Sequence, residues 1–134
     1  MQEEALTEQI IGCAMTVHRA LGPGFLEGVY VKALNHELCK AGLPVECNRP
    51  VKVMYDGFIV GEFIADMLVA HSIIVEVKAV RALAQTHELQ LVNYLTATGI
   101  EIGLLLNFGA GGLQVKRKHR TYRFGMDRID GKNF

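Results

Sequence analysis

Several features are missing from this chain of 134 residues, and each absence narrows the class of protein. No apolar run approaches the roughly 18 residues that a membrane-spanning helix needs, and no signal-peptide pattern opens the chain. The three cysteines, Cys13, Cys39 and Cys47, are widely spaced and odd in number, so they form neither a zinc-ligand pattern nor a disulfide framework. We therefore expect a cytoplasmic protein with buried thiols and no contact with a membrane.

The sequence also lacks internal repeats, low-complexity segments and any composition shift that would mark a domain boundary. Half of its residues are hydrophobic, which argues against disorder and provides enough apolar side chains for a core. We expect a single domain over residues 1–134, with an N-terminal helix over 1–21 and a basic C-terminal strand and tail over 113–134. A domain of this size has little room for a separate specificity module, and a homodimer is one way to widen its contact surface.

The chain has no net charge, but its charges are unevenly distributed. From residue 113 to the C-terminus there are seven basic and two acidic residues, a net charge of +5. Such an edge can bind a polyanion, here through Lys116, Lys118 and Arg120. It can equally be a solvated edge strand whose charges prevent aggregation. The remaining basic residues of the segment are Arg117, Arg123, Arg128 and Lys132.

Hydrophobic periodicity predicts an alternation of helices and strands. Apolar residues at helical spacing, with glycines at the ends, indicate helices over residues 4–21, 27–41 and 83–98. Apolar, β-branched runs and the Asp56-Gly57 hairpin signal indicate strands over 44–55, 58–69, 72–80, 100–108 and 113–124. The strand at 72–80, the helix after it and the continuously apolar strand at 100–108 are typical of a parallel crossover.

Three charged residues interrupt the most apolar part of the chain. Asp66 lies in one predicted strand, and Glu76 and Lys78 lie in the next, two residues apart and therefore on one face. Charged groups inside buried strands are costly unless they are paired or bind a metal ion. Two explanations fit the spacing. The carboxylates can hold Mg²⁺ beside a lysine that orients water, or Lys78 can form a buried salt bridge with one of them.

Two of the predicted helices add further polar candidates. Glu27 lies in the first turn of its helix, where a carboxylate favours the helix dipole, and Tyr30 neighbours it on the same surface. A glutamate beside a tyrosine that faces the core can also point toward the sheet. On the helix over 83–98, His87, Gln90 and Tyr94 share a face. His87 can contact phosphate there, or it can be satisfied by the helix itself.

Taken together, these motifs resemble those of a known family. The segment Gly24-Phe25-Leu26-Glu27-Gly28-Val29-Tyr30 reads GxxExxY, and Glu76-Val77-Lys78 reads ExK. Asp66 precedes the second motif, and the run from Gln90 to Tyr94 reads QxxxY. In this order, over about residues 6–120, they resemble the GxxExxY family of the PD-(D/E)XK nuclease superfamily. One position departs from the pattern, because Ala65 stands where the superfamily's name has proline.

The resemblance implies an α/β fold with an αβββαβ core, in which helices flank a mixed sheet. It also implies a metal-dependent nuclease that uses Mg²⁺ or Mn²⁺ to hydrolyse phosphodiester bonds in DNA or RNA. By motif, Asp66 and Glu76 resemble metal ligands beside the Val77 carbonyl, and Lys78 resembles the lysine that positions water. Glu27 resembles an acidic residue that some branches supply from the first core helix, for catalysis or a second ion. Gln90 and Tyr94 resemble the QxxxY pair that borders the active site in the RecB-type exonuclease branch. We expect Tyr30 and His87 also to help position the substrate.

Three functions are compatible with these motifs. The first, which we favour, is a metal-dependent nuclease. The second is a catalytically silent module on a nuclease fold that binds nucleic acid or serves a partner; against it, a decayed site would be expected to have lost Asp66, Glu76 or Lys78. The third is another metalloenzyme or an interaction protein, against which the basic C-terminal segment counts. The sequence does not select DNA over RNA, or single over double strands.

Overall fold

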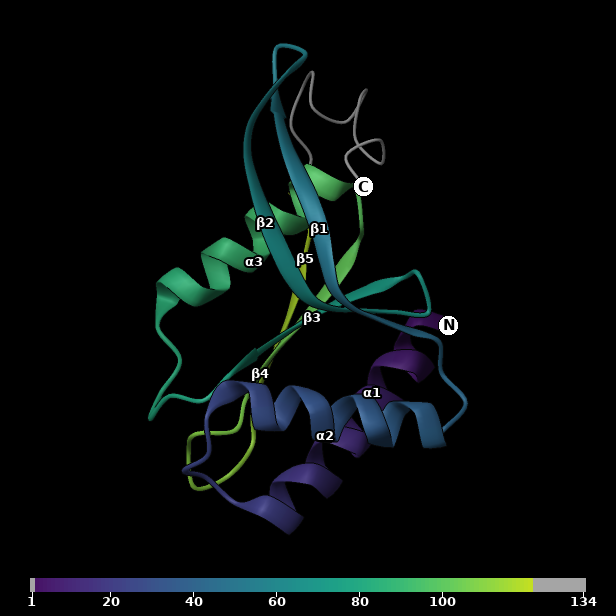
Figure 1. Cartoon of the computed structure of the whole chain (residues 1–134), viewed down its shortest axis with the longest axis vertical. Helices are drawn as coiled ribbons and strands as arrows, with labels where there is room; N and C mark the ends of the chain where they lie inside the picture. The colour runs from purple at the N-terminus through teal and green to yellow at the C-terminus, as the bar shows by residue number, and fades with distance from the viewer. Residues whose placement is uncertain (1, 122–134) are drawn as a thin grey trace.

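The computed structural model describes residues 2–121, which contain three helices and five strands (Figure 1). None of the helices in this range is long and apolar enough to cross a membrane. All eight predicted elements are present, and Gly99, with a φ of 78°, ends the third helix as predicted. The predicted last strand ends at His119, and its expected continuation beyond residue 121 lies outside the described residues. The elements are α1 (Gln2–Leu21), α2 (Glu27–Lys40), β1 (Val45–Tyr55), β2 (Phe58–Val69), β3 (Ile73–Lys78), α3 (Gln85–Thr98), β4 (Ile102–Asn107) and β5 (Gln114–His119).

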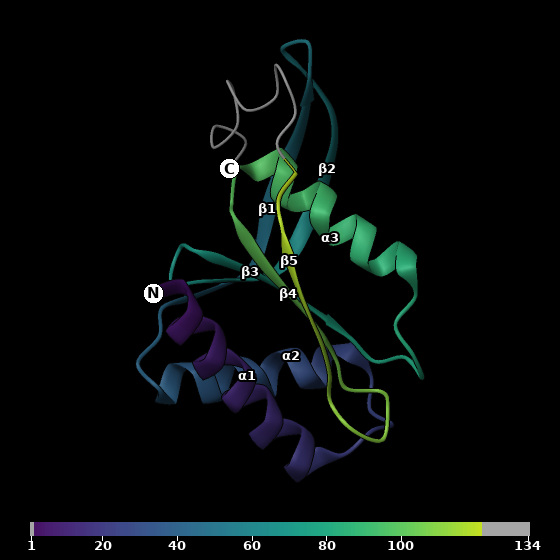
Figure 2. The ribbon, with the colours of Figure 1, turned by 180° about the vertical axis from the view of Figure 1, so that it is seen from behind.

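The strands form one mixed sheet in the order β1-β2-β3-β4-β5, which confirms the predicted fold class. β3 and β4 are parallel and are joined by α3, whereas every other neighbouring pair is antiparallel. The helices α1 and α2 pack against one face of the sheet, and α3 packs against the other (Figures 1 and 2). Two apolar cores result. The larger lies beneath α1 and α2, and the smaller lies between α3 and the sheet.

The β1–β2 hairpin extends well past the other strands and projects from the body of the protein (Figure 1). Its turn is made by Asp56 and Gly57, both with positive φ, as the Asp-Gly signal predicts. The register shifts where Val53 pairs with Gly61 but Met54 pairs with Ile59, so β2 has a bulge beside Gly61. The base of this hairpin carries Asp66, so its geometry positions the candidate site.

Tyr30 fixes the loop between α1 and α2 from inside the core. Its side chain is fully buried, and its ring stacks on Phe108 with centroids 4.8 Å apart. Its hydroxyl donates a hydrogen bond to the Gly22 carbonyl at 2.6 Å and accepts one from the Phe25 N–H at 3.1 Å. The tyrosine of the GxxExxY motif thus holds the loop that leads directly into Glu27.

Replacing Tyr30 by phenylalanine should therefore destabilise the protein. The change leaves one carbonyl and one N–H of the loop without a partner, which costs about 1–3 kcal/mol of unfolding free energy. Urea denaturation would measure it, with Tyr55→Phe as the matched control because the Tyr55 side chain is 73% exposed. Equal stability of both variants would show that the hydroxyl does not hold the loop.

Candidate active site

The candidate site lies where β2 separates from β3. The ladder between these strands covers only Met67–Val69 and Ile73–Val75, although both strands continue past it. Just beyond its end, the Oδ2 atom of Asp66 accepts the backbone N–H of Val77 at 2.8 Å. A side-chain carboxylate therefore satisfies an N–H that a continuing strand would have paired. The separation leaves room for polar groups inside an otherwise apolar sheet.

A local distortion of the hairpin accompanies this separation. Asn48 and Asp66 lie opposite each other in β1 and β2 but form no register pair. Asn48 has a φ of 54°, in the left-handed region that few residues other than glycine adopt. Along β2, Ala65 and Leu68 both pack in the core beneath α3 although they are three residues apart. The alternation of β2 side chains between the two faces of the sheet thus shifts by one residue around Asp66. The Asp66 carboxylate instead contacts the neighbouring strand β3.

Glu76 brings a second carboxylate to the same place. Ile74, two residues earlier in β3, packs beneath α3, and side chains two residues apart share a face of the sheet. Glu76 and Lys78 therefore both lie on the α3 face, as their spacing predicted. Glu76 is 8% exposed, and its Oε1 atom is buried without a hydrogen-bond partner. Burial raises the pKa of Glu76 to about 9, with the neighbouring Asp66 acting in the same direction and Lys78 opposing it. Burial and the Asp66 carboxylate thus both favour the protonated form of Glu76 in the metal-free protein.

Glu27 faces this group from the first residue of α2. Desolvation raises the pKa of Glu27, the charge of Lys78 opposes that rise, and the charge of Asp66 adds to it. His87 opposes it more weakly, so charges on β2, β3 and α3 all act on Glu27 at the start of α2. Of the four residues predicted to be catalytic, Asp66 and Lys78 thus lie close enough to act on the pKa of both Glu27 and Glu76.

Tyr94 closes the α3 side of the site. Burial raises the pKa of the Tyr94 hydroxyl, the negative charge of Glu76 raises it further, and a hydrogen bond from Gln90 works against both. The ring stacks on Phe63 of β2 with centroids 3.4 Å apart and planes 10° apart. Sequence reasoning missed Phe63, because it is one aromatic residue in a long apolar run. Its stacking fixes the orientation in which Tyr94 presents its hydroxyl.

The carboxylate pair fits a divalent cation. Hard cations bind carboxylate and carbonyl oxygens, and an unpartnered buried oxygen such as Glu76 Oε1 is a suitable donor. The Lys78 carbonyl accepts the Phe108 N–H at 2.8 Å, toward β4, so the preceding carbonyl, that of Val77, faces the side where β2 departs. Among residues 2–121, no three His, Cys, Asp or Glu side chains are grouped to hold a metal ion, so Glu27 does not complete a three-carboxylate site.

The raised pKa of Glu76 predicts an unusual pH dependence of stability in the metal-free protein. Because the pKa of Glu76 in the folded protein is raised above its ordinary value of 4.5, the folded protein binds this proton more tightly than the unfolded chain does. The resulting stabilisation of the folded state is fully present below pH 4.5. Stability from this group is then lost as the pH rises toward about 9, with a slope of at most about 1.4 kcal/mol per pH unit. Glu76→Gln should flatten this slope, measured by urea denaturation in EDTA between pH 5 and 9.

The control for this measurement is Glu62→Gln, which removes an exposed carboxylate from the hairpin. It should keep the slope of the unchanged protein. Identical slopes for Glu76→Gln and the unchanged protein would contradict a buried, protonated Glu76.

Two predicted substrate-positioning residues serve the fold in this structure. The Nδ1 atom of His87 accepts the backbone N–H of Ala84 at 3.0 Å and so caps the start of α3. His87 thus forms a hydrogen bond within its own helix start, which is one of the two roles that the sequence left open. Its charge also lowers the pKa of Glu27. Tyr30 is fully buried and anchors its loop, so any effect on substrate would be transmitted through that loop.

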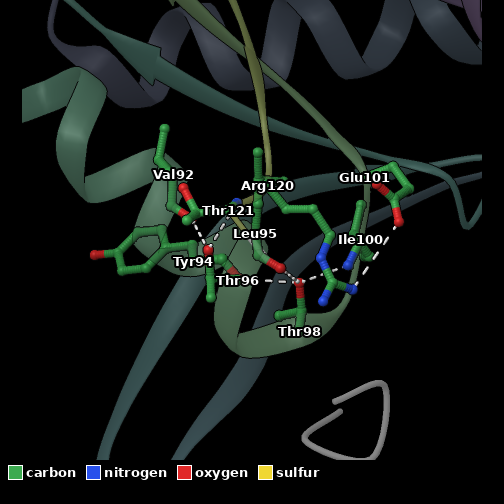
Figure 3. A network of polar contacts seen from close by, with 9 residues as sticks. All are labelled: Val92, Tyr94, Leu95, Thr96, Thr98, Ile100, Glu101, Arg120 and Thr121. Carbon is green, nitrogen blue, oxygen red and sulfur yellow. Dashed lines mark hydrogen bonds and ion pairs between the residues drawn. The ribbon is translucent and has the colours of Figure 1, made fainter. Parts of the chain in front are cut away.

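The basic edge strand is less available than its charge suggests. Lys118 donates to Glu88 of α3 at 2.9 Å, and the Arg120 side chain is only 5% exposed. Figure 3 shows Arg120 beside Glu101, within a network of polar contacts that joins the end of β5 to α3. Only Lys116 of the three predicted contacts is fully on the surface. The basic residues Arg123, Arg128 and Lys132 lie outside the described residues.

Comparison with known proteins agrees with this geometry. Residues 4–120 match the family model described as the PD-(D/E)XK nuclease superfamily. A search of curated proteins and a search of solved structures found no match. Members of this superfamily are in general nucleases, hydrolases that act on nucleic acid and use divalent metal ions such as Mg²⁺ or Mn²⁺. The match covers most of the chain and every candidate residue in the strand gap, so the protein belongs to the PD-(D/E)XK nuclease superfamily.

Proposed function

We propose that this protein is a metal-dependent nuclease of the GxxExxY type that hydrolyses phosphodiester bonds in DNA or RNA. One observation carries the proposal. Two carboxylates, Asp66 and Glu76, meet in a gap between strands, and a buried oxygen of Glu76 has no partner there. Such a pair is destabilising in a purely structural role and becomes favourable when it holds a cation.

The roles of the residues follow from their positions. Asp66, Glu76 and the Val77 carbonyl would hold Mg²⁺ or Mn²⁺, which when bound lowers the pKa of water and polarises the phosphate. Lys78 extends from the same face as Glu76 and offsets the negative charge that builds on the phosphate. Its ammonium would also orient the attacking water beside the carboxylates.

The outer residues would position the substrate. Gln90 and Tyr94 present an amide and a hydroxyl from α3 beside Glu76. Glu27 reaches the site from the opposite side, from the start of α2, and would orient water or hold a second ion. Lys116, which is exposed on the edge strand β5, would meet a phosphate farther along the nucleic-acid strand.

A module that binds nucleic acid without cleaving it is the alternative. The complete set of Asp66, Glu76 and Lys78, brought together by two separate strands, favours cleavage over it. A homodimer would enlarge the nucleic-acid surface of so small a domain under either function.

A panel of labelled nucleic acids tests the proposal. Single-stranded and duplex DNA and RNA would be incubated with the protein in Mg²⁺, Mn²⁺ or EDTA, with Glu76→Ala in parallel. We expect cleavage of at least one substrate with a divalent ion, none in EDTA and none by the variant. An intact panel with both ions would favour the non-cleaving module instead.

A further inference from the structure

A cavity opens beside Asp66, one member of the carboxylate pair. It has a volume of about 330 Å³ and lies between α2 and the base of β1. Glu27 and Asp66 line it, so it is continuous with the candidate active site. The remaining lining residues are Gly28, Val31, Lys32, Asn35, Cys47 and Asn48. No role in the proposed hydrolysis uses these residues.

The composition of the cavity suits an uncharged, planar, polar group. Asn35 and Asn48 contribute amides from two different elements, and Val31 adds an apolar wall. A few convergent polar groups with apolar walls are typical of a small-molecule site, and this volume is at the lower end of the usual range. The carboxylates of Glu27 and Asp66 repel phosphate, which leaves a nucleobase as the part of a nucleotide that fits.

The backbone at Asn48 gives independent support. Its φ of 54° is held in the middle of a strand, directly opposite Asp66. Strained backbone at a non-glycine residue persists where the surrounding structure requires it, and such residues cluster at ligand sites. The asparagine at this distortion lines the cavity. Lys32, which is exposed and also lines the cavity, is placed to meet the phosphate attached to a bound base.

We infer that this cavity receives one unpaired nucleobase next to the phosphodiester that the carboxylate site cleaves. The inference rests on the proposed function and adds a substrate class to it. A cavity of about 330 Å³ cannot admit a duplex, so a base must leave its stack and its partner to enter. Single strands and frayed or overhanging ends offer such a base without the cost of unpairing, and they are therefore the preferred substrates.

Two variants remove the amides with little effect on the fold. Asn48→Gly deletes the side chain at a position where glycine adopts the left-handed backbone without strain. Asn35→Ala deletes the second amide from α2. The matched control is Asn93→Ala, which removes an exposed amide from α3, away from the cavity. Each protein would be assayed in Mg²⁺ on a 12-nucleotide single strand and on the blunt duplex of the same sequence, as DNA and as RNA.

The unchanged protein should cleave the single strand with the higher kcat/KM. Asn48→Gly and Asn35→Ala should each reduce kcat/KM on the single strand about 10-fold, mainly through KM, the scale expected when one partner of a base is lost. Cleavage of the duplex should change little, and Asn93→Ala should match the unchanged protein. If both cavity variants cleave single strands normally, the inference is overturned and the nuclease activity stands.

Binding of the four nucleoside monophosphates, followed by NMR, separates the remaining outcomes. Binding to the unchanged protein that is lost in Asn48→Gly supports the cavity even if no nucleic acid is cleaved, in which case the proposed hydrolysis alone fails. If there is neither cleavage nor binding of any monophosphate, both the inference and the proposed function are wrong.

Discussion

Replacing Asp66 by asparagine or Glu76 by glutamine should abolish cleavage of every nucleic acid that the unchanged protein cuts. Each change removes a carboxylate charge from the pair that would hold the cation. Both retain the shape of the side chain, and asparagine keeps an oxygen that can accept the Val77 N–H. Cleavage rates with Mg²⁺ or Mn²⁺, measured beside urea denaturation of the same preparations, would check the result.

The stability measurement separates function from folding in these two variants. Glu76→Gln removes the cost of ionising a buried carboxyl, so above neutral pH its metal-free form should be at least as stable as the unchanged protein. An inactive but stable Glu76→Gln is therefore the expected combination, with Glu62→Gln as the active control. Full activity in either Asp66→Asn or Glu76→Gln would remove the carboxylate pair from the mechanism.

Lys78→Ala should behave differently from the carboxylate variants. It removes a positive charge from an acidic site, so cation binding should persist or become tighter. Cleavage should nevertheless fall by about 10²–10³, the usual loss for one preorganised group that stabilises charge in the transition state. Single-turnover cleavage rates at saturating Mg²⁺, with calorimetric titration of the ion, would separate the two effects.

The same variant tests the salt-bridge explanation that the sequence left open. If Lys78 only neutralises Glu76 or Asp66, then Lys78→Ala should have a lower free energy of unfolding. Its cleavage activity per folded molecule should stay unchanged. Exposed Lys52 on the hairpin supplies the control, because Lys52→Ala should change neither cation binding nor cleavage. Loss of stability without loss of specific activity would assign Lys78 to structure.

Much of this fold could be predicted from local signals in the sequence. Hydrophobic periodicity located the helices and strands, and Asp56-Gly57 located the hairpin turn, because turn geometry depends on the residues that form it. The two-residue period of a strand also placed Glu76 and Lys78 on one face correctly. These features are set by neighbours in the chain, so a single sequence contains them.

Other features depend on residues that are distant in the sequence. The left-handed backbone at Asn48 and the unpaired position of Asp66 arise from the way β1, β2 and β3 meet, which no local pattern encodes. Charge counting likewise could not show that Lys118 pairs with Glu88 on α3, thirty residues earlier in the chain. The cavity beside Asp66 was missed because α2 and β1 form it jointly.

The central claim is that Asp66 and Glu76 form one divalent-cation site, and calorimetric titration with Mn²⁺ tests it most directly. The unchanged protein at pH 8 should bind the ion with saturation and release a proton as Glu76 ionises, seen as a dependence of the heat on the buffer. Asp66→Asn and Glu76→Gln, shown to be folded, should bind it far more weakly, whereas Lys78→Ala should bind it well. If the correctly folded, unchanged protein bound no Mn²⁺ or Mg²⁺, the account of a metal-dependent nuclease would be contradicted.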